Sequence, residues 1–110
     1  VHHLASNKNK MWTPVFNDLV QMYGKLDESW NKLKVPQNSK HPEQYHRWVA
    51  DALFQIDLIA QGDREKFLEL FEKYIMNTVN ENPWLLKKAW WEQYGDEFWQ
   101  WWESTKKGGF

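Results

Sequence analysis

The sequence predicts a mainly α-helical fold with a small β element. Apolar residues recur at spacings of three and four along several segments, which is typical of helices that bury one face. Proline and glycine residues stand where these segments begin or end. The length of 110 residues is that of a single domain. Nine tryptophans, within an aromatic content of 17%, give so short a chain enough apolar surface for a sizeable core.

The first predicted helix begins at Thr13 and Pro14, because a hydroxyl residue followed by proline is a typical helix start. Apolar residues at helical spacing continue it to Tyr23, and Gly24 predicts its end. The alternation of apolar and polar residues over 30–35 then predicts a short strand. The segment before the first helix is polar and lacks periodicity, so no element is predicted there.

Residues 36–40 predict a loop, and Pro42 opens the second helix as its first residue. An apolar face continues this helix to about Ala60. Gly62 ends it, and the following aspartate caps a third helix with its apolar face over 67–75.

The C-terminal third of the chain predicts two further helices. Pro83 starts a fourth helix that continues to about Tyr94. Gly95 predicts a break, and a short Trp-rich helix then runs to about Thr105. Residues 106–110 are expected to be a frayed end.

Several classes of chemistry are excluded by composition. The absence of cysteine excludes disulfides, thiolate zinc sites and a thiol nucleophile. Apolar runs are too short for a transmembrane helix or a secretory segment, so no membrane partner is expected. Neither a glycine-rich phosphate loop nor a GxSxG nucleophile elbow occurs.

Charge is distributed unevenly between the two halves of the chain. Residues 1–50 carry seven Lys or Arg against four acids, and residues 51–110 carry seven against eleven. All four histidines lie in the basic half. This pattern suits a polyanionic substrate such as nucleic acid, and ordinary charge scatter is the alternative.

The adjacent histidines His2 and His3 form the first candidate site. One ring can ligate a metal while the other takes a proton from water, because neutral imidazole is both a good ligand and a base near neutral pH. The alternative is a remnant of a purification tag at an exposed terminus.

A second candidate site surrounds the start of the second helix. His41 stands at the helix start and His46 lies just over one turn inside it, so both rings could reach one ion. Gln37 or Glu43 could add oxygen ligands. The alternative is a histidine at a cap and another packed under Trp48.

Three motifs in order carry a family resemblance: His-His-Leu-Ala-Ser-Asn-Lys-Asn at 2–9, Asp-Glu-Ser-Trp-Asn at 27–31 and His-Pro-Glu-Gln-Tyr-His-Arg-Trp-Val at 41–49. Together they resemble the HNH/endonuclease VII nucleases of the AHH type, which occur as C-terminal toxin modules of bacterial polymorphic toxins. The resemblance covers roughly residues 2–75.

The resemblance implies a ββα-metal (His-Me finger) nuclease core over residues 1–60, followed by a helical C-terminal extension over 61–110. It implies that His3 is the general base and that Asn31 holds this base in position. One divalent ion, of magnesium, manganese, nickel or zinc, would stabilise the phosphorane charge and the leaving oxygen. The ligands implied for this ion are His2, His41 and His46, with the alternative that one of the last two polarises the phosphate.

Members of the family carry a histidine at the position of Gln37. This residue is therefore either a weaker oxygen ligand or a departure that lowers activity. Four basic residues are candidates for binding the substrate phosphates. They are Lys32, Lys34, Lys40 and Arg47.

The same resemblance implies a biological role. It implies a metal-dependent endonuclease that cuts DNA in preference to RNA and acts as an antibacterial toxin effector. Such a domain would be secreted or delivered by a bacterial secretion system, act in the cytoplasm of the target cell and be neutralised by a cognate immunity protein.

The tryptophans near the C-terminus lie outside the resemblance. They are Trp84, Trp90, Trp91, Trp99, Trp101 and Trp102. Core packing is one interpretation, and a binding surface is the other. In the second case the chain would be a non-catalytic helical interaction module, or an inactive nuclease homologue, that binds a partner through this C-terminus.

Overall fold

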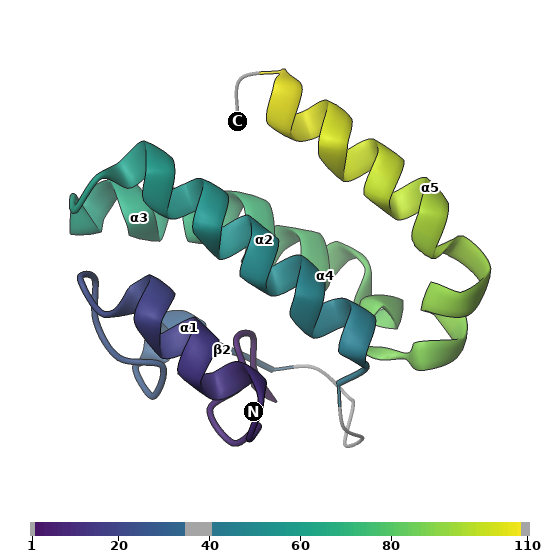
Figure 1. Ribbon diagram of the computed structural model, residues 1–110, viewed down its shortest axis with the longest axis horizontal. Coiled ribbons are helices and arrows are strands. Elements are labelled where there is room, and N and C mark those ends of the chain that lie inside the picture. The colour runs from purple at the N-terminus through teal and green to yellow at the C-terminus, as the bar shows by residue number, and fades with distance from the viewer. Residues whose placement is uncertain (1, 35–40, 109–110) are drawn as a thin grey trace.

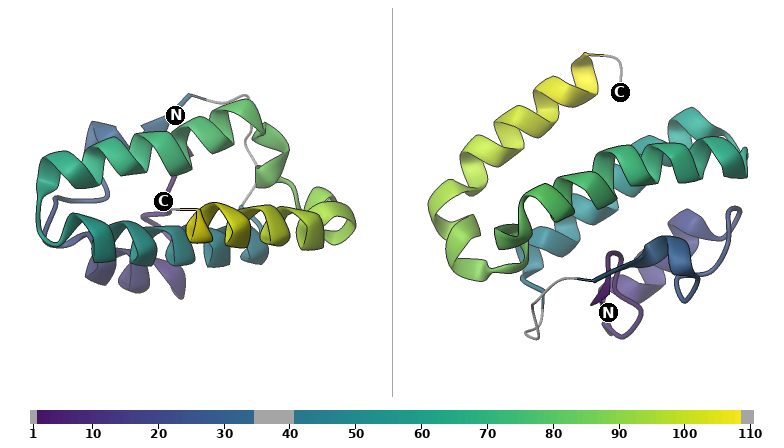
Figure 2. Two further views of the ribbon diagram at one scale, coloured as in Figure 1. Left: turned by 90° about the horizontal axis from the view of Figure 1, so that it is seen from above. Right: turned by 180° about the vertical axis from the view of Figure 1, so that it is seen from behind.

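The computed structural model describes residues 2–34 and 41–108. The fold is mainly helical, as predicted, and measures 36 × 32 × 23 Å. The helix α2 (Glu43–Ala60) lies at the centre, with α1 (Trp12–Val20) on one side and α5 (Lys88–Lys107) on the other (Figure 1). A second layer lies behind α2 and contains α3 (Arg64–Phe71) and α4 (Asn77–Glu81) (Figure 2).

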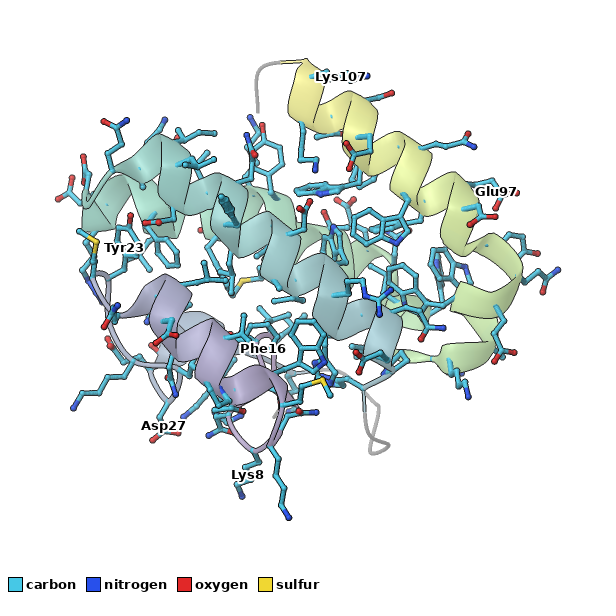
Figure 3. The ribbon with its side chains drawn as sticks, viewed as in Figure 1. Lys8, Phe16, Tyr23, Asp27, Glu97 and Lys107 are labelled. Carbon is cyan, nitrogen blue, oxygen red and sulfur yellow. The ribbon has the colours of Figure 1, made fainter. Side chains whose placement is uncertain are left out.

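The helix α1 begins at Trp12, next to the predicted start. The Asn9 side chain starts it, because its Oδ1 accepts the backbone N–H groups of Met11 and Trp12, both at 2.9 Å. Phe16 is fully buried on the face that α1 turns toward α2 (Figure 3). Gly24 follows with φ of +151°, where glycine is the residue that fits without strain.

Two short strands pair antiparallel within the described residues. The strand β1 (His2–His3) pairs with β2 (Lys32–Leu33), and His3 lies opposite Lys32. The predicted strand is thus confirmed as a shorter element, preceded by the 3-10 helix η1 (Ser29–Asn31). The strand β1 was not predicted, since a two-residue strand leaves no periodic pattern.

The second and third predicted helices are confirmed. Pro42 is the N-cap of α2 and not its first helical residue. The helix α3 (Arg64–Phe71) begins at Asp63, whose side chain accepts the Lys66 N–H. It continues through the π-helical turn η2 (Glu72–Met76) into α4 (Asn77–Glu81).

The predicted break at Gly95 is wrong. The 3-10 helix η3 (Pro83–Leu86) is followed by α5, which runs uninterrupted through Gly95. This glycine is buried, and a Cβ there would lie 3.4 Å from Cε3 of Trp91, an ordinary contact distance, so the helix has room for a small side chain at this position. The predicted fraying is also wrong for Lys106, which lies in α5 and pairs with Asp51 at 2.8 Å.

The Trp-rich helix contributes mainly to the core. Trp102 is fully buried, donates its indole N–H to Asp51 at 2.7 Å and packs edge-on against Trp48. Trp101 remains 47% exposed. Within the two described stretches, no helix has both the length and the apolar character needed to span a membrane.

Candidate functional site

The site is built around Asn31, at the end of η1. Its fully buried amide makes three bonds: Oδ1 accepts the Ala5 N–H at 2.8 Å, and Nδ2 donates to the carbonyls of Ala5 at 2.8 Å and Leu26 at 2.9 Å. The Asn31 carbonyl accepts the N–H of Leu4 at 2.8 Å. Asn31 therefore fixes the chain directly after His3.

The helix α2 holds the same segment from the other side. The Tyr45 hydroxyl donates to the Leu4 carbonyl at 2.7 Å. Burial raises the pKa of Tyr45 well above its ordinary value, so the hydroxyl stays protonated and remains a donor. The end of β1 is thus held between η1 and α2.

His3 lies beside a carboxylate from the loop before η1. Its Nε2 is 3.5 Å from Oδ1 of Asp27. This nitrogen is shielded from solvent and has no hydrogen-bond partner among the described residues. The Lys32 ammonium is 3.7 Å from the same carboxylate oxygen, and Asp27 itself is exposed at the edge of the molecule (Figure 3).

His3 and His41 line one shallow hollow, which is partly open to solvent and, as the described residues line it, has no room inside it for a water molecule. The hollow lies where β1, β2 and the start of α2 meet α4 and η3. Its lining is largely apolar and consists of His3, Leu4, Leu33, His41, Tyr45, Val79 and Leu86. The fold therefore brings together two of the predicted site histidines from distant parts of the chain.

His46 occupies a different environment, inside the interface between α1 and α2. Its buried ring stacks on Trp12 with a centroid separation of 6.2 Å and lies 6.1 Å from Phe16. Its ring centroid is 5.8 Å from that of His41. Burial lowers the pKa of His46, partly offset by the Glu43 charge, so the ring is neutral near pH 7.

The Asn9 amide faces the His46 ring. The Asn9 Oδ1 already accepts two backbone N–H groups, so its Nδ2 is the atom 3.4 Å from His46 Nε2. Because the Asn9 Nδ2–H group faces Nε2, this ring nitrogen must be the one that accepts, and the proton of the neutral ring is on Nδ1. The Nδ1 atom is buried and has no hydrogen-bond partner in the described part of the chain. Metal binding through Nδ1 would require the Asn9 amide to turn.

The predicted metal site stays a prediction. Among residues 2–34 and 41–108, no group of three or more His, Asp or Glu side chains is arranged to hold an ion. Two candidate ligands, the side chain of His2 and all of Gln37, fall outside what the structure describes, as does the candidate phosphate-binding residue Lys40.

The predicted phosphate-binding residues differ in their availability. Lys34 follows β2 and is exposed. Arg47 is exposed on α2, 4.0 Å from Glu43. Lys32 is half-buried and is engaged by Asp27.

Sequence reasoning missed three residues that shape the site: Asn9, Asp27 and Tyr45. All three lie within the motifs that carry the family resemblance, but no role was predicted for any of them. Comparisons with models of protein families, with curated proteins and with solved structures found no match to this chain. The geometry of the site is therefore the main basis for a functional proposal.

Proposed function

We propose that this chain is a metal-dependent nuclease that hydrolyses phosphodiester bonds, with DNA as the favoured substrate over RNA. The observation that carries the proposal is the placement of His3 and His41 around one hollow, beside the backbone segment that Asn31 clamps. The spatial pairing adds support, because β1 pairs antiparallel with β2 and α2 follows β2, as a ββα-metal core requires, although α1 and η1 lie between the two strands in the chain.

His3 is the proposed general base. It takes a proton from a water molecule, whose oxygen forms a bond to phosphorus while the bond from phosphorus to the 3′ oxygen breaks. The leaving oxygen departs with the electron pair and takes a proton from solvent. Imidazole suits this role because it gains and loses a proton near neutral pH.

Asn31 is the proposed positioning residue for this base. Its amide bonds to Ala5 and Leu26 fix the segment that carries His3, and Tyr45 fixes it from α2. A rigid base needs no reorganisation before it meets the substrate, which favours the reaction.

Imidazole nitrogens are ligands that divalent transition metals favour, which suits His41 at the hollow and His2, a ligand proposed from the resemblance. These two residues would hold the ion, and His46 would join them only if the Asn9 amide turned. When bound, the ion would stabilise negative charge on the phosphate and on the leaving oxygen.

The phosphates of the substrate would be bound by the exposed basic side chains of Lys34 and Arg47, together with Lys40. The role as an antibacterial toxin effector, its delivery by a secretion system and its neutralisation by an immunity protein are proposed from the family resemblance.

The experiment incubates the protein with supercoiled plasmid and, separately, with total RNA, in the presence of Mg²⁺, Mn²⁺, Ni²⁺ or Zn²⁺ and with or without EDTA. We expect metal-dependent loss of the DNA, abolished in His3→Ala and retained in the control Gln93→Ala, which changes an exposed residue on α5. Full activity in His3→Ala would refute the role of the base. If both polymers survive, Gln37→His is tested, and continued inactivity would refute the nuclease proposal.

A second candidate function is a protein-interaction module, and the exposed aromatic flank of α5 favours it. Tyr94 and Trp101 are 45% and 47% exposed, and the partly buried rings of Trp90 and Phe98 connect them. This candidate requires that Trp101→Ala abolish binding to a purified partner while His3→Ala leaves binding unchanged.

A further inference from the structure

We infer that Asp27 is a positioning residue for His3: it fixes the imidazole with its proton on Nε2 and leaves the Nδ1 lone pair to accept a proton. The inference rests on the proposed function only in naming His3 as the base. The arrangement of the ring itself follows from the contacts of this chain.

The geometry at Nε2 carries the inference. Oδ1 of Asp27 lies 3.5 Å from Nε2, just too far for a formed hydrogen bond, and Nε2 is shielded from solvent with no hydrogen-bond partner among the described residues. A carboxylate stabilises the N–H of an imidazole nitrogen that faces it and repels a lone pair at that position. The neutral ring therefore carries its proton on Nε2.

The carboxylate is itself held in place. Lys32 lies directly across the strand pair from His3, and its ammonium is 3.7 Å from the same Asp27 oxygen. The preceding residue, Leu26, is buried, and its carbonyl is bound by the Asn31 amide. The backbone directly before Asp27 is therefore held by the same Asn31 amide that holds the segment after His3.

The consequence for the reaction concerns both of the ring's protonation states. In the resting ring, Nδ1 holds the lone pair that removes the proton from water. After the transfer, the ring is an imidazolium whose Nε2–H already faces a carboxylate, which stabilises the positive charge.

The first test is nitrogen-15 NMR of the whole chain at about pH 8.5, where ordinary imidazoles are neutral. Long-range correlations from the ring protons identify which nitrogen is protonated, and the spectrum of His3→Ala assigns the His3 signals. We expect Nε2–H in the unaltered protein and in Asp27→Asn, whose amide oxygen can still accept. We expect a larger fraction of Nδ1–H in Asp27→Ala, because an imidazole without a neighbouring carboxylate is a mixture of both tautomers, and no change in the control Asp18→Ala, another exposed carboxylate.

The second test compares the kinetics of the same variants. General-base catalysis typically contributes 10²–10⁴-fold, so we expect Asp27→Ala to lower kcat by about 10-fold with little change in KM. Asp27→Asn should recover part of this loss. Thermal unfolding should be nearly unchanged, because exposed ion pairs contribute little stability.

The outcomes separate this inference from the nuclease proposal. A majority of Nδ1–H in the unaltered protein, or an Nδ1–H fraction in Asp27→Ala no larger than in the unaltered protein, overturns the inference whether or not the chain cleaves nucleic acid. A change of tautomer without any loss of kcat in an active enzyme overturns the positioning role. If the chain proves inactive with every metal, the NMR result still decides whether Asp27 fixes the ring.

Discussion

Replacing Asn31 by alanine tests whether one buried amide holds the N-terminal segment. The substitution removes three side-chain bonds of 2.8–2.9 Å. A typical hydrogen bond contributes about 0.5–1.5 kcal/mol net, and an unsatisfied buried group adds to the cost, so we expect a loss of about 3 kcal/mol in the free energy of unfolding. Folded domains of this kind are stable by about 5–15 kcal/mol, so the variant should still fold.

The measurement is urea unfolding followed by tryptophan fluorescence. With a slope of about 1–3 kcal/mol per molar, the midpoint should fall by about 1–3 M. Ser29→Ala, at an exposed position in η1, is the control and should leave the midpoint nearly unchanged. A loss below about 1 kcal/mol in Asn31→Ala would show that water or neighbouring groups replace the amide, and would refute the clamp.

The remaining predictions concern packing and charge. Burial lowers the pKa of His46, so below about pH 6.5 the unfolded chain binds more protons than the folded one and the folded state loses stability as the pH drops. The melting temperature of His46→Phe should therefore fall less between pH 8 and pH 5 than that of the unaltered protein. Asp51→Ala leaves the buried Trp102 indole N–H without its acceptor and should cost about 1–3 kcal/mol in urea unfolding. Gly95→Ala should change the free energy of unfolding, measured by calorimetry, by less than about 1 kcal/mol, because alanine favours a continuous helix. A destabilisation above about 3 kcal/mol would indicate that α5 is interrupted at this glycine.

The helices were predictable because their signals are local. The boundaries of α2 and α3 follow from apolar periodicity and from residues such as Pro42 and Asp63 that stand at their starts. The prediction failed at Gly95, where the cost of glycine in a helix, about 1 kcal/mol, is smaller than the gain from burying neighbouring aromatic side chains. A glycine does not end a helix when the residues before and after it bury the same apolar face, because packing then outweighs the local preference of the glycine.

The site was predictable only in part. The family resemblance singled out His3 and Asn31, and in the structure the Asn31 side chain binds the backbone close to His3. The contacts of Asp27 with His3 and of Asn9 with His46 join residues far apart along the chain. Such pairings depend on how the strands and helices meet in space, so spacing along one sequence does not reveal them.

Stability and activity should separate in one set of variants and change together in another. Asn31 and Tyr45 hold the backbone next to His3, so truncating either should weaken both folding and cleavage. Asp27 acts on the His3 ring through an exposed carboxylate, so its truncation should lower cleavage alone. If Asp27→Ala instead destabilised the protein as much as Asn31→Ala does, the carboxylate would belong to the clamp, and the choice of proton position on His3 would rest with the backbone geometry that Asn31 fixes.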